Sequence, residues 1–592
     1  MAPRRLDIGE TLRRIGRVTR HDQVVLSTLA VVIGAIGGGS AIGFREAIGA
    51  IQLLFYGFGS ERVHSLAGAL PWWHILLATT IGGLAVGLMV EFLMPGKRPR
   101  GVADVMETSA LRGGRMSLRE GLGASLVSAL SIGCGASVGR EGPVVHLGAS
   151  LSAFVADRLR LGRALSQTLL GCGVAAAVAA SFNAPIAGAF FALEVVVGHY
   201  AMGAFTAIVI ASVTGTVISR MWFGDFPAFS IPGQPIASFL EFPAFAILGV
   251  VSAGVAIAFI AATGLAATAV HRVPVPPWLR PAIGGLLVGL IAIAFPHVLG
   301  VGYEATDAAL REQFGLWMLL TLLALKIAAT SISLGSGFGG GVFSPSLFLG
   351  AMVGGAFGIV ATDVFPDLSS GPGAYTIVGM GAVAGAVLGA PISTLLMVFE
   401  LTGNYALTIG VMIATVIASL LTKQVYGFSF FTWQLDRRGL NLRRGREQGL
   451  LQSVRVRDVM HADPRTVPPA ASLAEIRRHL LEAPYGELFV VDETGRLHGT
   501  ITLADLADAA FDTEFDMLLN AEDVCRPRPP LLAAGDDLEA AMALVDGLRD
   551  DIVAVVDDAN TLGLVGYVRQ ADVVRAYDRA VLQARAEEYG EG

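Results

Sequence analysis

The sequence predicts a polytopic α-helical membrane domain built from two inverted halves with broken helices, followed by a cytoplasmic α/β tail that contains a tandem repeat. Three observations lead to this fold class. Of the 592 residues, 53% are apolar and only 15% are charged, which is too apolar a composition for a soluble protein. Many apolar segments are shorter than the about 20 residues that a full membrane span requires. The 73 glycines and 26 prolines often interrupt them, as in transporters with discontinuous helices.

Composition and charge set the boundaries of the parts. The N-terminus is rich in arginine, so the positive-inside rule predicts that it is cytoplasmic. We expect the tail to be cytoplasmic as well. The protein is predicted to be a multi-pass protein of a bacterial inner membrane. The net charge of −7 argues against nucleic acid as a partner. The predicted parts are a basic N-terminus at 1–22, a membrane domain at 23–440 with halves at about 23–222 and 238–426, a linker at 441–452, and the tail at 453–592.

An internal repeat supports the two halves. The turn Asn183-Ala184-Pro185 leads into an apolar run that ends at Glu194, and the turn Gly389-Ala390-Pro391 leads into a similar run that ends at Glu400. A Gly/Ala-rich helix precedes each turn, and a Gly-rich turn with a proline precedes each of those helices. Paired, broken segments in corresponding positions are typical of inverted-repeat transporters.

The tail also repeats, with units at about 453–512 and 520–580. In each unit an apolar strand ends in turn residues and is followed by a second strand and a helix. The predicted strands are 488–491 and 497–502 in the first unit, and 552–556 and 564–568 in the second.

The most informative motif is Gly139-Arg140-Glu141-Gly142-Pro143, a charged turn between apolar runs. A carboxylate in this setting must be paired, or must face water or an ion path. Pro143 suits the first turn of a helix, and Gly139 and Gly142 allow a close approach of the backbone. We therefore expect a broken helix whose N-terminal amides bind an anion, with Glu141 at the place that the anion would occupy.

With the Asn183–Pro185 turn and a second glycine-rich motif, Gly341-Val342-Phe343-Ser344-Pro345, this motif gives the chain a family likeness. Residues 24–440 resemble the CLC family of chloride channels and proton-coupled chloride exchangers. The tail resembles a pair of CBS domains, which many CLC proteins carry.

The resemblance implies a homodimer in the lipid bilayer in which each subunit holds its own path for chloride or a similar small anion. It assigns the gate to Glu141, which occupies an anion site when ionised and leaves when protonated or displaced. The anion would be bound by main-chain amides at helix N-termini. The positions that the resemblance assigns are Arg140, Gly142, Val342 and Phe343 for anion binding, and Gly139, Pro143, Pro185, Gly341 and Pro345 for the structure of the motifs.

Three positions depart from the family pattern. Arg100 stands where the family has an anion-binding serine, and it either strengthens anion binding or points into the basic linker, which we favour. Phe431 occupies the position at which the family has an inner-gate tyrosine, so the tyrosine hydroxyl is lost. Val195 occupies the position of the glutamate that relays protons in the exchangers, and a valine side chain cannot bind a proton. His146, about one helical turn past Glu141, is either a substitute relay or, as we favour, a structural residue.

The resemblance therefore favours a passive chloride channel gated by voltage and pH. The alternative is a chloride/proton antiporter on the same fold, and a CBS-regulated carrier of divalent cations is a third reading. The absence of a His-Glu-x-x-His zinc pair argues against an intramembrane metalloprotease, and we expect no enzyme activity and no metal site.

No cofactor is required by this interpretation. In the tail, Thr502 and Asp505 fit the Ser/Thr-x-x-Asp pattern by which CBS domains hold an adenosine ribose. Asp572 is the matching acid in the second unit, where an arginine replaces the hydroxyl residue. These residues are either part of an adenine-nucleotide site or ordinary helix caps.

Overall fold

The computed structural model describes the greater part of the chain, and the elements below belong to those residues. The basic residues Arg4, Arg5, Arg13, Arg14, Arg17 and Arg20 and the linker 441–452 lie outside the described residues. The described residues are 22–60, 62–198, 202–225, 229, 238–403, 405–440, 454–483, 485–506, 516, 519–545, 551–558 and 561–589.

The chain forms two compact units, Met1–Asn441 and Leu442–Gly592. The first half of the membrane unit contains α2 (Asp22–Tyr56), α3 (Val63–Ala67), α4 (Trp72–Leu93), α5 (Val102–Leu111), α6 (Leu118–Gly133), α7 (Glu141–Arg158), α8 (Arg163–Phe182), α9 (Pro185–Phe191), a π-helical turn (Ala192–Val197) and α10 (Met202–Phe223).

The second half is all helical as well, within the residues that the structure describes. It contains α11 (Phe242–Arg272), α12 (Arg280–Ala294), α13 (Tyr303–Leu310), α14 (Leu316–Ser336), α15 (Phe343–Val364), α16 (Pro372–Leu388), α17 (Pro391–Thr402), α18 (Tyr405–Val425) and α19 (Phe430–Asp436), with 3₁₀ turns at Phe239–Glu241, Pro277–Leu279 and Pro296–Val298.

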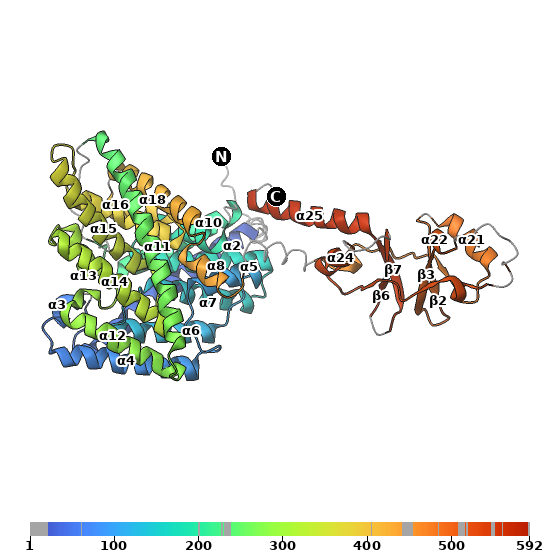
Figure 1. Ribbon diagram of the computed structural model, residues 1–592, viewed down its shortest axis with the longest axis horizontal. Coiled ribbons are helices and arrows are strands. Elements are labelled where there is room, and N and C mark those ends of the chain that lie inside the picture. The colour runs from blue at the N-terminus through green and yellow to red at the C-terminus, as the bar shows by residue number, and fades with distance from the viewer. Residues whose placement is uncertain are drawn as a thin grey trace, which may run out of the picture. The chain divides into compact units, whose positions relative to one another are not determined.

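The membrane unit mixes full spans with short buried helices. Among the described residues, nine helices are long and apolar enough to cross a membrane. The apolar helix α17 and the segment Pro185–Val197 are shorter. Helices α4 and α12 run side by side along one edge of the unit, and α15 packs against α16 (Figure 1). The mixture agrees with the broken-helix pattern predicted from the sequence.

The two halves are joined by two glutamate side chains, one from each half, that each bind main-chain amides of the other half. Glu194 accepts hydrogen bonds from the main-chain amides of Ile392 (3.1 Å) and Ser393 (2.8 Å), at the start of α17. Glu400, which lies on α17, accepts from the amides of Ile186 (2.8 Å) and Ala187 (2.7 Å), at the start of α9. Each glutamate therefore caps the helix N-terminus of the other half, where unpaired amides and the helix dipole favour a negative charge.

The turns before these helices are also equivalent. Helix α8 ends at Asn183 and α16 ends at Gly389, both in the left-handed conformation with φ of 59° and 68°. Each turn is followed by a proline at the first helical position, Pro185 in α9 and Pro391 in α17. Proline at this place costs no hydrogen bond. The sequence repeat thus corresponds to a repeat of structure.

The tail contains two small sheets, and each has a parallel strand pair followed by an antiparallel pair. In the first, β1 (Thr466–Val467) pairs in parallel with β2 (Glu487–Val491), which pairs antiparallel with β3 (Leu497–Thr502), and β3 pairs with β4 (Arg526–Pro527). In the second, β5 (Leu531–Ala533), β6 (Ile552–Val556) and β7 (Leu564–Arg569) repeat the order parallel then antiparallel. The register shifts between Val490 and Val491 and, equivalently, between Val555 and Val556.

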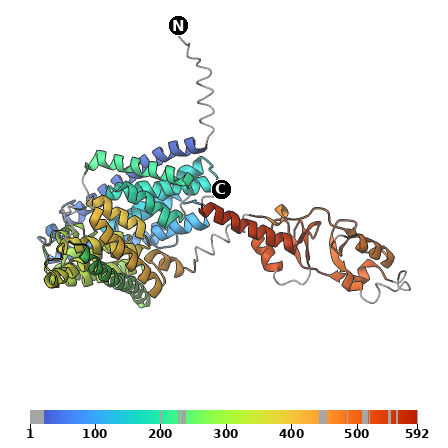
Figure 2. The same ribbon diagram turned by 90° about the horizontal axis from the view of Figure 1, so that it is seen from above.

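Helices complete both tail units. They are α21 (Leu473–Glu482), α22 (Leu503–Leu506) and α23 (Ala521–Val524), then α24 (Leu538–Val545) and the long α25 (Gln570–Tyr589), with a 3₁₀ turn at Val456–Asp458. Helix α25 is drawn in red in Figure 2. Phe489 and Tyr567, one from each unit, lie in a common apolar cluster, so the two units share part of their core.

Removing either exchanged carboxylate should destabilise the membrane unit. Glu194→Ala and Glu400→Ala each leave helix-start amides unpaired, so we expect each to lower the free energy of unfolding by about 1–2 kcal/mol. The thermal unfolding midpoint of the full chain in detergent measures this. The control is Arg112→Ala, which removes an exposed ion pair with Glu107 and should change little. Equal midpoints for all four proteins would contradict the capping role.

Candidate functional site

The two glycine-rich motifs meet in the middle of the membrane unit. The amide of Gly139 donates to the carbonyl of Gly341, and the amide of Gly341 donates to the carbonyl of Gly139, both at 2.7 Å. A Cβ atom on Gly341 would lie 2.9 Å from the amide nitrogen of Gly142, so only glycine allows this approach. Helix α7 begins at Glu141 and α15 at Phe343. The predicted motifs therefore bring two helix N-termini together.

Glu141 lies at this meeting point and is 2% exposed. Its Oε1 accepts hydrogen bonds from the Tyr303 hydroxyl at 2.6 Å and from the Ser344 hydroxyl at 2.5 Å. Its Oε2 is buried without a hydrogen-bond partner among the described residues. The carboxylate is thus bound on one side only, and the second oxygen is available to a water or a proton.

Arg140 supplies positive charge beside the carboxylate. Its guanidinium lies over the ring of Tyr303, 4.8 Å from the ring centre, and its Nε is 3.9 Å from Oε1 of Glu141. The arginine is itself buried. The two hydroxyl groups and the guanidinium therefore hold the Glu141 side chain in one position.

The segment that carries Tyr303 is fixed by a buried cation. Lys326 of α14 is fully buried and donates to the carbonyls of Val298 and Gly300, both at 3.0 Å. Its ammonium also lies 5.0 Å from the ring centre of Phe348. Lys326 therefore anchors the turn that ends at Gly302 and positions the tyrosine hydroxyl.

Sequence analysis did not identify Tyr303 and Ser344 as site residues. Ser344 belongs to the motif Gly341–Pro345, but only the amides of that motif were given a role. Its hydroxyl group, directly after the first residue of the predicted helix, could have indicated that Ser344 is a hydrogen-bond donor in the site. Tyr303 lies 162 residues from Glu141, and no local pattern of the sequence connects them.

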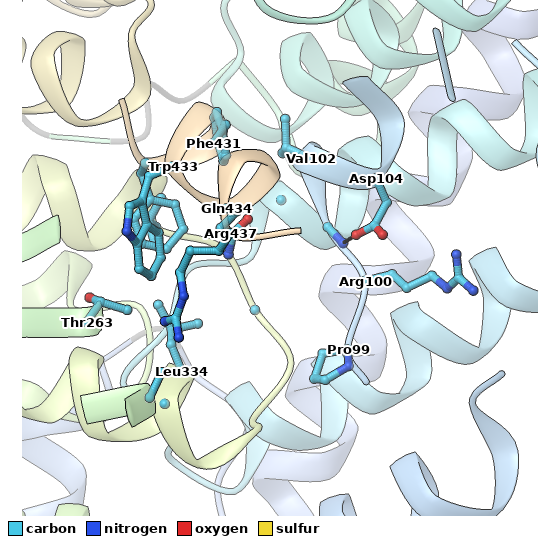
Figure 3. A pocket seen from close by; sticks show the side chains of 18 of the residues that line it. Pro99, Arg100, Val102, Asp104, Thr263, Leu334, Phe431, Trp433, Gln434 and Arg437 are labelled. Carbon is cyan, nitrogen blue, oxygen red and sulfur yellow. Dashed lines mark hydrogen bonds between the residues drawn. The ribbon is translucent and has the colours of Figure 1, made fainter. Parts of the chain in front are cut away.

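A cavity of about 270 Å³ reaches the meeting point from one side (Figure 3). We call it the first cavity. Five of the predicted site positions, Arg100, Gly142, Gly341, Val342 and Phe431, lie on its wall. The other lining residues are Pro99, Gly101, Val102, Asp104, Thr263, Ala267, Leu334, Gly335, Phe338, Gly340, Phe430, Trp433, Gln434, Arg437 and Arg438.

Arg100 is not placed as an anion ligand. Its guanidinium forms an ion pair with Glu120 at 3.1 Å, and in Figure 3 it points away from Trp433 and Arg437 across the cavity. The expectation that Arg100 binds the anion is therefore not supported, because a carboxylate already neutralises its charge. Of the two readings of this residue, the one that directs it away from the anion path fits the geometry.

A second cavity, of about 240 Å³, also lies next to Glu141 but is lined by other residues. Its wall includes Arg140 and Tyr303, whereas the first cavity includes Gly142 and Val342. The other lining residues are Arg45, Glu46, Ile48, Gly49, Gln52, Gly59, Ser60, Val63, Ile132, Phe223, Val301 and Gly302. The two chain neighbours of Glu141, Arg140 and Gly142, thus line two different cavities.

Other predicted positions are packed within or between helices. Phe343 is buried and packs against Phe182, with ring centres 4.8 Å apart. Val195 is buried in the π-helical turn, directly after the capping residue Glu194. Pro143 and Pro345 lie in the first turns of α7 and α15.

In the tail, Asp505 already has partners for both carboxylate oxygens. Its Oδ2 accepts from the amide (2.8 Å) and the hydroxyl (2.7 Å) of Thr502, and its Oδ1 accepts from Arg526 Nε at 2.6 Å. Partial burial alone would raise the pKa of Asp505, but the hydrogen bonds from Arg526 and Thr502 outweigh it and lower the pKa. The carboxylate therefore caps α22 in this structure.

Asp572 in the second unit is enclosed by more cationic groups. It accepts from Arg569 at 2.8 Å and from Arg575 at 2.5 Å, and it lies 2.9 Å from the imidazole of His461. Burial again opposes these hydrogen bonds, which together lower the pKa of Asp572. A ribose would have to displace an arginine from either aspartate.

Comparison with known families agrees with the motifs. The family model described as "Voltage gated chloride channel" matches residues 82–423. The chain belongs to the CLC family. The CBS domain model matches residues 456–512 of the tail.

Related proteins cover the same part of this CLC chain. A putative chloride channel protein, ClcB-like, from Ralstonia nicotianae is 35% identical over 66% of this chain and 91% of its own length. The voltage-gated ClC-type chloride channel ClcB of Escherichia coli O157:H7 (strain EC4115 / EHEC) is 31% identical over 68% of this chain and 97% of its own. The crystal structure of a slow cyanobacterial Cl⁻/H⁺ antiporter matches with a TM-score of 0.63 and 22% identity, over 71% of this chain and 98% of its own. The protein is therefore a multi-pass membrane protein with the CLC fold and a CBS-containing tail.

The two hydroxyl donors should hold the gate closed. Tyr303→Phe or Ser344→Ala removes one hydrogen bond to the Glu141 carboxylate, worth about 1.5–3 kcal/mol. The carboxylate then leaves its place more readily, so anion flux at a fixed pH should rise by about tenfold. Flux into vesicles measures this. Tyr56→Phe is the control, since the Tyr56 hydroxyl donates to the carbonyl of Cys134 instead; an equal rise in that variant would contradict the assignment.

Proposed function

We propose that this protein conducts chloride passively through each subunit, with Glu141 as a gate that responds to pH and voltage. As a CLC protein it carries out chloride transport of the CLC type, so the proposal concerns the mechanism. The observation that carries it is the buried carboxylate of Glu141, whose chain neighbours line two different cavities. While ionised and hydrogen-bonded, it occupies the place of an anion. When it is protonated or displaced, the helix N-termini at Gly142 and Phe343 can bind chloride reversibly.

Val195 is the reason for proposing a channel. The family's exchangers use an acid at this position as an internal proton relay, and valine has no group that titrates. Its neighbour Glu194 does not substitute for that acid, because its carboxylate is bound to the start of α17. Chloride can therefore cross without an obligatory exchange for protons.

A chloride/proton antiporter is the second candidate. It is favoured by the similarity of the fold to a structure described as a Cl⁻/H⁺ antiporter. The same gate serves either mechanism, because a carboxylate that opens on protonation also carries a proton if it exchanges with both sides. The two candidates differ in whether protons cross with chloride.

We further propose that the first cavity faces the cytoplasm and that the protein is a homodimer with one path per subunit. Arg437 and Arg438 line the first cavity, and positive residues concentrate on the cytoplasmic side. Both cavities and the gate are made by one chain, so a dimer would contain two complete paths. We also propose an inner-membrane location, since the ClcB relatives are bacterial, with both termini in the cytoplasm because the N-terminus is rich in arginine.

Reversal potentials distinguish the two mechanisms. A chloride channel should reverse at the chloride equilibrium potential, about 59 mV for a tenfold gradient, with no change when a pH gradient is imposed. An antiporter should show a shift with the pH gradient at constant chloride. Glu141→Gln should conduct at a rate independent of external pH. A Glu141→Gln protein that still gates with pH would refute the assignment of the gate.

We also propose that the tail binds adenine nucleotide at Thr502 and Asp505, with Arg526 turning from the aspartate to the phosphates. Arg526 supplies the cation and Asp505 the acceptor for ribose hydroxyls, and the two are in contact. No cofactor is required for transport itself.

Nucleotide binding can be measured on the full chain by equilibrium dialysis with ATP. Asp505→Ala should lower the affinity by about tenfold or more, as expected for the loss of charge-assisted hydrogen bonds. Asp572→Ala is the matched variant in the second unit and should have little effect, because three cationic side chains surround Asp572. Equal affinities for the wild type and Asp505→Ala would refute this site.

A further inference from the structure

Two histidines that the gate described above does not use are in contact near the second cavity. The rings of His64, in α3, and His297, in the 3₁₀ turn Pro296–Val298, are stacked with their centres 4.4 Å apart and their planes at 22°. Val63, the chain neighbour of His64, lines the second cavity. Both histidines lie between helices that are long enough to span a membrane, not within one. A histidine in such a place can change its charge with the pH of the solution.

One carboxylate connects this pair to the residue that holds the gate. Glu304 Oε2 accepts hydrogen bonds from the main-chain amides of His64 at 3.0 Å and Ser65 at 3.3 Å. The same oxygen lies 2.9 Å from Nδ1 of the His64 ring. Glu304 directly follows Tyr303, whose hydroxyl donates to Glu141. A displacement of α3 therefore reaches the tyrosine through a single peptide unit.

The second histidine is connected to the same tyrosine along the chain. His297 directly precedes Val298, whose carbonyl accepts from the buried Lys326, and the turn that follows leads to Tyr303. Val298 also lies in one apolar cluster with Ala67 of α3. The stacked rings thus belong to the packing between α3 and the segment that positions the tyrosine hydroxyl.

Few charges face the stacked rings. Glu304 favours a protonated ring at both positions, and a charge on His64 disfavours a second one on His297. The turn that carries His297 packs against α3, α12 and α14, and α3 also packs against α13. Among the described residues, the other charged groups on or directly before these elements are Arg62 before α3, Arg280 of α12, Asp307 of α13 and Lys326 of α14.

Burial makes the packed pair difficult to protonate. It lowers the pKa of His64, and burial together with the charge of His64 lowers the pKa of His297 to about 4, although Glu304 acts in the opposite direction. An imidazole in water has a pKa of about 6.5. Protons therefore favour a state in which the rings have separated. The stacked arrangement keeps its full stability above a pH of about 6.5 and loses it progressively as the pH falls toward about 4.

We propose that the stacked pair His64–His297 is an acid sensor that holds Tyr303 against the gate carboxylate while both rings are neutral and releases it when one ring binds a proton. The sensor regulates the gate proposed for Glu141 and rests on that proposal. A hydronium ion on the second-cavity side gives a proton to a ring nitrogen and becomes water. Nδ1 of His297 has no hydrogen-bond partner among the described residues. The charged ring gains hydration by leaving the stack, and α3 and the turn then no longer fix the tyrosine.

The test varies the pH separately on the two sides of a planar bilayer that contains the full-length protein. His64→Gln and His297→Gln keep a planar polar side chain that cannot titrate. We expect half-maximal chloride flux to require about tenfold more acid on the second-cavity side, a shift of about one pH unit. The response to acid on the first-cavity side should remain, which also shows that the variants are folded. His297→Lys places a permanent charge in the stack and should raise the flux at neutral pH toward the level that acid evokes in the wild type.

The connection through Tyr303 is tested in the Tyr303→Phe protein. The hydrogen bond that the pair controls is already absent there, so the addition of His297→Gln should not change the pH of half-maximal flux. A shift as large as the one in the wild-type background would overturn the proposal.

His74→Gln is the matched control. His74 lies in α4 of the same unit, bonds the carbonyl of Phe55 at 2.7 Å and stacks on Tyr56, so its substitution should leave both responses unchanged. A wild-type pH profile in His64→Gln and His297→Gln would overturn the proposal, and so would an equal shift in His74→Gln.

Failure of the gate itself gives a different result. If Glu141→Gln keeps the responses of the wild type to acid on both sides, the gate assignment fails, and the sensor that acts on the gate fails too. If Glu141→Gln loses both responses while the two histidine variants keep the wild-type profile, the gate stands and only the sensor is refuted.

Discussion

The membrane unit depends on the contact between the first turns of α7 and α15. Two main-chain hydrogen bonds between Gly139 and Gly341 hold the helix starts so close that no side chain fits between them. Each helix start carries unpaired amides and a partial positive charge. Two such ends repel one another unless negative charge lies between them. The carboxylate of Glu141 lies at this place in the structure described here, and in the mechanism that we propose a permeating anion replaces it.

This electrostatic requirement explains the buried polar groups around the site. Tyr303 and Ser344 bind one oxygen of the carboxylate, and Arg140 lies beside it. Lys326 lies in the protein interior, where it donates to two main-chain carbonyls and lies over the ring of Phe348. These contacts fix the turn that precedes Tyr303. The site therefore includes a supporting layer of residues from α13 and α14 as well as the two motifs.

The sequence was sufficient for the fold and for the two motifs that meet, because glycine, proline and an isolated glutamate in apolar surroundings have few physical explanations. The strands β2, β3, β6 and β7 of the tail were also predictable, since short apolar runs end in turn residues at Asp492 and Asp557, whereas the short strands β1, β4 and β5 were not predicted. Tyr303 and Lys326 could not be predicted, because their roles depend on contacts between distant segments. The direction of the Arg100 side chain could not be predicted either. It depends on the ion pair with Glu120, and the packing of α6 brings Glu120 close to Arg100.

The crossed capping by Glu194 and Glu400 bears on how such a chain arose. Each half supplies one carboxylate and receives one, and neither half can satisfy its own helix start in this way. Two copies of a half-length ancestor, arranged about a two-fold axis, would make the same pair of contacts with a single glutamate position. Fusion of the copies would then have preserved an interface that already existed. Each half of the fused chain would still need the glutamate that the other half supplies.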